Sequence, residues 1–195
     1  ALPISGADAG QVSFIAPQSP VPINVAVVHG TDTSDNNLDG FRSIVDQLND
    51  STEFRFNAVM VAPEGIDTVG ELAAFDALIM GDTGNVVAGY AIFADALRPW
   101  VEAGGGLITT GQGLHGATFE STAVRQQLDA VVPVDLLSSR ATKDSPLIEI
   151  TDASHAVTAG LEDFEIGSIL VEYPIGGADA GAQVLAMADG APVVV

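Results

Sequence analysis

The chain contains no cysteine, and its 6 basic residues stand against 26 acidic ones in 195 residues. Without cysteine it can form no disulfide, no thiolate metal site and no cysteine nucleophile. The formal net charge of −20 offers phosphate groups almost no counter-charge, so we expect no nucleic acid and no anionic membrane surface among the partners. No apolar run reaches the roughly 18 residues of a membrane-spanning helix, so we expect no membrane insertion.

Apolar residues make up 47% of the chain, which is enough to bury a core, most simply as one domain. Residues 1–22 carry four prolines and no helical period, which predicts an extended arm or linker. From residue 23 to 195, strand and helix patterns alternate in a way that is typical of a parallel α/β domain. The expected strands are Ile23–Val28, Phe54–Val61, Ala77–Met80 and Gly106–Thr110, followed by shorter ones at Leu147–Ile150, Ser168–Val171, Gln183–Met187 and Val193–Val195. The expected helices are Gly40–Leu48, Thr68–Phe75, Ala88–Ala103 and Ser121–Leu128.

Several segments in this order carry a family resemblance. They are Val25–Gly30, Leu72–Ile79, Trp100–Ile108, His155–Leu161 and the pair Glu172-Tyr173. Together, residues 23–195 resemble the class I glutamine amidotransferase-like superfamily, in particular its trehalose-utilisation-like branch. The resemblance implies a flavodoxin-like three-layer α/β/α sandwich with a mostly parallel sheet.

The turn after the strand Gly106–Thr110 is the place where such folds build a catalytic site. The amidotransferase triad uses a cysteine at this turn with a histidine and a glutamate downstream, whereas this chain has Gly111. We therefore assign no catalytic residue and expect no amidotransferase chemistry. An alternative is a Ser/Thr-type hydrolase acting on a small molecule or sugar, built from Thr110, His155 and Glu172.

Two groups of residues could hold a metal. Asp35, Asn37, Asp39 and Asp46 follow the spacing of a calcium loop, in which oxygens at alternate positions surround one ion. The alternative is a polar turn in which Asp39 caps the helix that follows. Calcium is the only cofactor that we expect.

His29, Asp82 and His115 each follow an expected strand, so they could meet at one edge of the sheet as ligands of zinc or iron in a metal-dependent hydrolase. The alternative is that both histidines are turn residues bonded to nearby backbone.

The segment Pro3–Val12 closely matches Pro174–Val184, with one alanine inserted in the second copy. Bias towards Ala, Gly and Asp could produce part of this match. The other interpretation is that the first residues are the tail of a preceding similar domain, in an array with a period of 171 residues (174 minus 3).

The resemblance extends to domains of large secreted bacterial repeat proteins. We therefore expect a non-catalytic structural or adhesive module of a secreted, tandem-repeat, self-assembling protein at the cell surface or outside the cell. Its expected partners are copies of itself or adjacent repeats. We expect these to cover the edge strand Val193–Val195, since an open valine edge invites pairing.

Overall fold

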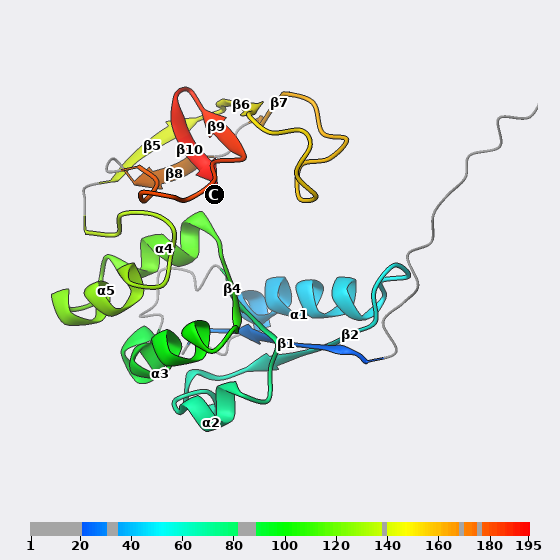
Figure 1. The fold of residues 1–195 in the computed structure, drawn as a ribbon, viewed down its shortest axis with the longest axis vertical. Coiled ribbons are helices and arrows are strands. Elements are labelled where there is room, and N and C mark those ends of the chain that lie inside the picture. Colours follow the sequence, from blue (N-terminus) through cyan, green and yellow to red (C-terminus); the bar gives the residue numbers. More distant parts are fainter. Residues whose placement is uncertain (1–20, 31–34, 82–88, 138–139, 168–169, 175–176) are drawn as a thin grey trace, which may run out of the picture.

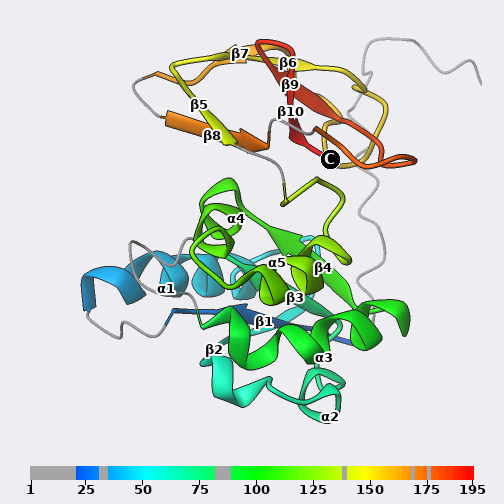
Figure 2. The same ribbon diagram turned by 90° about the vertical axis from the view of Figure 1, so that its left-hand side faces the viewer.

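The computed structural model describes residues 21–30, 35–81, 89–137, 140–167, 170–174 and 177–195. A helix-and-sheet part forms one end of the molecule, and a smaller part made of antiparallel strands forms the other (Figures 1 and 2). The chain passes from the first part to the second after residue 137. The expected arm lies almost entirely outside the described residues.

A four-stranded parallel sheet forms the centre of the first part. Its strands are β1 (Ile23–Val28), β2 (Phe56–Val61), β3 (Ala77–Met80) and β4 (Gly106–Thr109), in the order β2-β1-β3-β4. This order, with β1 between β2 and β3, is that of flavodoxin-like folds. The predicted α/β fold class is confirmed.

Helices cover both faces of this sheet, which gives three layers (Figures 1 and 2). On one face, α1 (Asp35–Asn49) packs against Val25 and Val27 of β1 through Phe41. On the other face, Ala26 and Val28 contribute to the larger core. This second face is covered by the short 3-10 helix η1 (Pro63–Gly65) and the helices α2 (Val69–Leu72), α3 (Tyr90–Glu102), α4 (Gly111–Ala117) and α5 (Thr122–Asp129). Burial of β1 on both faces explains why its sequence is continuously apolar.

The end of α3 is shaped by a close approach between Gly105 and Trp100. A Cβ atom on Gly105 would lie 2.3 Å from Cε2 of Trp100, so no larger residue fits without moving the indole ring. Gly104 turns the chain with a φ of +104°, and β4 begins directly afterwards. The glycine run therefore ends the helix and lets the chain enter the sheet beneath the tryptophan.

The second part consists of a two-stranded ribbon and a four-stranded antiparallel sheet. The ribbon pairs β5 (Arg140–Asp144) with β8 (Leu170–Pro174). The sheet has the order β10-β9-β6-β7, formed by Ala191–Val194, Ala186–Ala188, Leu147–Ile150 and Phe164–Glu165. Its own small core contains Ile148, Ala186 and Ala188.

Several expectations about elements need correction. The first helix begins at Asp35 rather than Gly40, so Asp39 lies inside α1 and does not cap it. Residues 111–117, expected as a glycine-rich turn, form α4. The strands β5 and β7 were not expected. The residues of Val193–Val195 are half-buried, with Val195 packed against the main core.

Candidate functional site

The carboxyl edge of the parallel sheet is the place where this topology builds sites. There, β1 is followed by His29 and Gly30, β3 by Gly81, and β4 by Thr110. The residues directly beyond two of these strand ends, 31–34 and 82–88, lie outside the described part of the chain, and Asp82 is among them. What is described of this edge is mostly the turn between β4 and α4.

Thr110 organises this turn. Its backbone N donates to Met80 O at 3.1 Å, which extends the pairing of β3 and β4 by one residue. Its Oγ1 accepts a hydrogen bond from Gly113 N at 3.0 Å, so the hydroxyl caps the first turn of α4. Gly111 is the first residue of the helix and contributes no side chain to this edge.

Gly113 holds α4 directly against the end of β3. A Cβ atom there would lie 2.7 Å from Met80 O and 2.8 Å from Gly81 O, which only glycine avoids. The buried hydroxyl of Tyr90 donates to Gly113 O at 2.7 Å, which ties α3 to the same turn. Packing and backbone contacts therefore define the conformation of this turn.

The side chain of each histidine of the expected metal cluster contacts a residue that is close to it in the sequence. His29 Nδ1 lies 2.8 Å from Gly30 O, and the backbone N of His29 donates to Val61 O at 3.2 Å. His115 lies on α4 and packs edge-on against Phe119, with 5.0 Å between the ring centroids. The contact of His29 matches the alternative in which it is a turn residue bonded to nearby backbone. Within the described residues, no three His, Asp or Glu side chains lie close enough together to hold a metal ion.

The residues of the alternative Ser/Thr-type hydrolase lie on different parts of the fold. Thr110 belongs to the parallel sheet edge, whereas His155 lies in the connection between β6 and β7. His155 Nδ1 accepts from Val157 N at 3.3 Å, and its carbonyl accepts from Thr158 N at 3.0 Å. Glu172 lies on β8 opposite Thr142 of β5.

The connection around His155 is ordered by Asp152. The carboxylate accepts hydrogen bonds from Ser154 N at 2.9 Å and Ser154 Oγ at 2.6 Å, and from Gln183 Nε2 at 2.8 Å. These bonds, those from Ser154 first, hold the pKa of Asp152 below its usual value. Thr158 is buried, and its hydroxyl donates to the backbone carbonyl of Asp152. This network fastens the connection to the segment before β9.

The candidate calcium residues Asp35, Asn37, Asp39 and Asp46 all lie on α1. An α-helix turns by about 100° and rises by about 1.5 Å per residue. Positions 35, 39 and 46 therefore share one face, 37 lies on the opposite face, and 39 and 46 are separated by about 10 Å along the axis. The side chains of Asp35 and Asn37 are outside the described set. A helix does not place four such ligands around one ion, so a calcium loop here requires the first turns of α1 to unwind.

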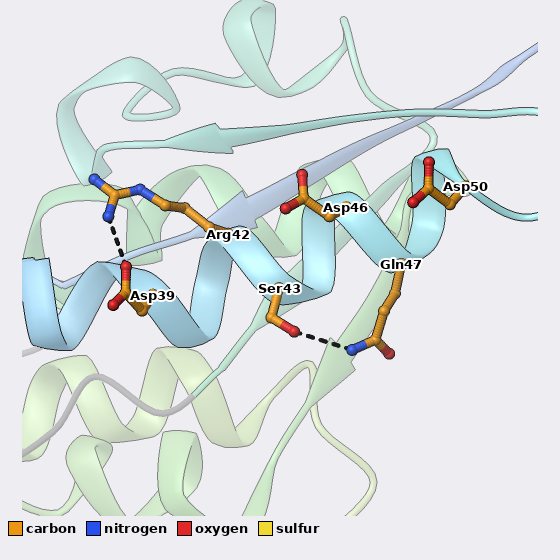
Figure 3. Close-up of a pocket in the computed structure, with 6 residues that line it drawn as sticks. All are labelled: Asp39, Arg42, Ser43, Asp46, Gln47 and Asp50. Carbon is orange, nitrogen blue, oxygen red and sulfur yellow. Dashed lines mark hydrogen bonds and ion pairs between the residues drawn. The ribbon is translucent and has the colours of Figure 1, made fainter.

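An exposed acidic face runs along α1. Figure 3 shows Asp39, Asp46 and Asp50 on this face, with Arg42 turned towards Asp39. Arg42 Nη1 donates to Asp39 Oδ1 at 2.8 Å, an exposed ion pair within the helix. Ion pairs of this kind contribute about 0.3–0.5 kcal/mol. The face is a polar surface of the helix.

One contact that joins the two parts of the molecule is not predicted by the sequence pattern. Val134 forms an antiparallel bridge with Ala178, outside the named strands. Single bridges have no sequence pattern of their own. The signal that pointed towards this segment was its match with Pro3–Val12.

Comparisons with solved structures support the fold. The chain is similar to a ThuA-like protein from Bacteroides uniformis, with a TM-score of 0.58 and 14% identity over 88% of this chain and 70% of that one. It also aligns with a GMP synthase component from Thermoplasma acidophilum, with a TM-score of 0.49 and 8% identity over 89% and 76% of the two chains. At this level of identity, the likeness to the ThuA-like protein shows a shared fold.

Comparisons by sequence add no closer relative. No family model matches the chain, and no curated protein matches it. Within the described residues, no helix is long and apolar enough to cross a membrane.

Proposed function

We propose that this chain is a non-catalytic structural or adhesive module of a secreted, tandem-repeat, self-assembling protein, at the cell surface or outside the cell. The observation that supports it most is the turn after β4. The resemblance implies a nucleophile there, and the chain has Gly111 in its place, at the start of α4. The neighbouring hydroxyl of Thr110 accepts the helix-capping hydrogen bond from Gly113 N.

Further support comes from what the residues around the β4–α4 turn do in this chain. Gly113 and Tyr90 fasten helices to the sheet by close packing and a buried hydrogen bond. These contacts hold the scaffold together without adding a reactive side chain. A scaffold built in this way suits a module that functions through contacts made by its surface.

The non-catalytic part of the proposal is tested by activity. We expect no steady turnover of glutamine or of an activated ester, because the position of the nucleophile carries no side chain. Thr110→Val is the decisive variant, since it removes the nearest hydroxyl while keeping the shape of the residue. Turnover that depends on Thr110 would instead establish the Ser/Thr-type hydrolase, and turnover that depends on added zinc or iron would establish the metal-dependent one.

The self-assembly part is tested by sedimentation velocity over a wide range of protein concentration. We expect the weight-average mass to rise above that of the 19.9 kDa monomer as concentration increases. A monomer at every concentration, in both low and high salt, would contradict assembly by this chain.

A further inference from the structure

The bridge between Val134 and Ala178 is the centre of a short docking contact. Asp135 N donates to Gly177 O at 3.2 Å, and Asp179 N donates to Pro133 O at 3.0 Å. We call residues 133–135 the docking edge and residues 174–184 the tail segment. The tail segment thus adds one short antiparallel strand to the docking edge through backbone hydrogen bonds.

The docking edge is a fixed part of the α/β core. Val134 is buried and belongs to the main hydrophobic cluster. Two residues further on, Leu136 is fully buried, and its backbone N donates to Asp129 Oδ1 of α5 at 2.7 Å. The edge is therefore held in place by the core, and it presents backbone groups to any segment that can reach it.

The tail segment has a definite sequence requirement. Gly177 and Gly181 adopt φ values of +82° and +92°, a region that favours glycine. Between these glycines lie only small or short residues, of which Ala178 makes the bridge. A segment that replaced the tail segment would need glycine at the same two positions.

Residues 3–12, which we call the arm segment, meet this requirement. Nine of the ten residues in Pro-Ile-Ser-Gly-Ala-Asp-Ala-Gly-Gln-Val match the tail segment once Ala182 is left out. Gly6 and Gly10 correspond to Gly177 and Gly181. Bias towards Ala and Gly does not by itself align glycines with the two positions whose backbone needs them.

The correspondence extends beyond the docking contact at 177–179 and ends before β9. Continued past Val12, it would place Phe14 in the position of Ala186 of β9, which is 1% exposed and has no room for a phenyl ring. The arm segment therefore repeats the docking element and not the strand that follows it.

We propose that the arm segment is a second docking element, which binds the docking edge of another copy of this chain. This inference rests on the proposed self-assembly and names the surface that carries it. Within one chain the tail segment holds the edge at an effective concentration on the order of millimolar. An arm from a second copy therefore binds when the tail segment is released, or when copies are held close together as repeats.

Disulfide trapping tests the contact directly, because the chain has no cysteine of its own. The test variant combines Ala7→Cys with Val134→Cys, since Ala7 corresponds to Ala178. Paired residues of an antiparallel bridge lie about 4.5–5.5 Å apart at Cα, within the range of a disulfide. Gly177→Val is added to weaken the competing tail segment at its positive φ. We expect oxidation to give cross-linked dimers and larger species.

Two matched variants control this result. Ala178→Cys with Val134→Cys is expected to give a cross-linked monomer, which verifies that the geometry allows the bond. Ala1→Cys with Val134→Cys places the thiol on the same arm but outside the arm segment, and we expect at least a several-fold lower yield of cross-linked dimer. Equal yields for Ala7→Cys and Ala1→Cys would overturn the proposal, and so would a cross-linked monomer from the Ala7→Cys variant.

If Gly177→Val does not fold, the Ala7→Cys and Ala1→Cys variants are compared in chains that keep Gly177, at the highest soluble protein concentration. A higher yield of cross-linked dimer from Ala7→Cys supports the proposal, and equal yields overturn it. Sedimentation of the chain without cysteines separates this inference from the proposed function. If the chain associates but Ala7→Cys gives no more cross-linked dimer than Ala1→Cys, the proposed self-assembly stands and the docking edge is not the surface that carries it.

Discussion

At the scale of single residues, glycine has two opposite roles in this chain. Gly113 lies where α4 meets the end of β3, and a Cβ atom there would overlap two backbone oxygens. Gly40 lies inside α1 with nothing within 4 Å of its Cβ position. One glycine is required by close contact, whereas the other only lowers the helix propensity of its surroundings.

We predict that Gly113→Ala destabilises the protein by about 1–3 kcal/mol, because neither carbonyl can move without disturbing the sheet. Gly40→Ala is the matched control, and it should stabilise by up to about 1 kcal/mol through helix propensity. Denaturant unfolding of the three chains gives both values. Equal effects at the two positions would show that the contact at Gly113 is not tight.

The carboxylate of Asp152 links stability to pH. Its pKa is lowered in the folded protein by hydrogen bonds from Ser154 and then Gln183, relative to the ordinary value of 3.8. The ionised carboxylate of Asp152 therefore stabilises the folded state. This contribution to the free energy of unfolding is complete above pH 3.8 and is lost as pH falls through the lowered pKa.

We predict that Asp152→Asn destabilises the protein at pH 6 and that the difference from the original chain shrinks as pH falls below 3.8. Urea unfolding at a series of pH values measures this difference. A difference that stays constant down to pH 2 would show that the hydrogen bonds do not depend on the charge of Asp152.

At the scale of elements, α4 and α1 show how context decides secondary structure. Three of the seven residues of α4 are glycine, which has a low helix propensity. The helix forms because Thr110 caps it and because Tyr90 and the end of β3 hold its first turn. In α1, the spacing of a calcium loop coincides with a helix whose apolar face, including Phe41, packs on the sheet.

For α1 the prediction is that calcium raises the melting temperature by binding Asp35, Asn37, Asp39 and Asp46, with a loss of helical circular dichroism as the first turns unwind. At a calcium concentration 100 times Kd the gain would be about 2.7 kcal/mol. Asp39→Asn and Asp46→Asn should each remove the calcium effect.

Asp50→Asn is the control for α1, since Asp50 lies on the same acidic face but outside the loop spacing. It should keep the response to calcium. Melting curves that coincide in chelator and in millimolar calcium would rule out the loop. An equal loss of the calcium-dependent rise in melting temperature with Asp50→Asn would show that calcium only screens the charge of the acidic face.

At the scale of the whole molecule, charge opposes the assembly that we propose. A chain with a net charge of −20 repels its own copies, and this repulsion is screened over about 10 Å at 0.1 M salt and about 3 Å at 1 M. The docking contact itself consists of backbone hydrogen bonds between uncharged groups, so salt should weaken the repulsion more than the contact.

We therefore predict that self-association strengthens as sodium chloride rises from 0.1 to 1 M. Sedimentation equilibrium at several salt concentrations gives the association constant. Deletion of residues 1–20 should remove the salt-dependent association while leaving the circular dichroism of the fold unchanged. Association that weakens with salt would instead indicate attraction between charged groups.

The sequence by itself determined the elements whose pattern follows from burial. β1, β3 and β6 have the predicted bounds, because a strand covered on both faces or on one face has an apolar pattern that needs no distant information. The sequence alone also showed Gly111 at the turn where the resemblance implies a nucleophile, and the match between two segments.

Only the tertiary structure decided the remainder, because it depends on contacts between distant residues. The helix at 111–117 is stabilised by its contacts with β3 and Tyr90. The helix propensity of the local sequence does not reflect these contacts. Asp39 lies inside α1, which begins at Asp35, although the residues of α1 that pack on the sheet begin only at Phe41. The bridge from Val134 to Ala178 joins residues 44 positions apart (178 minus 134), so no local pattern could have indicated it.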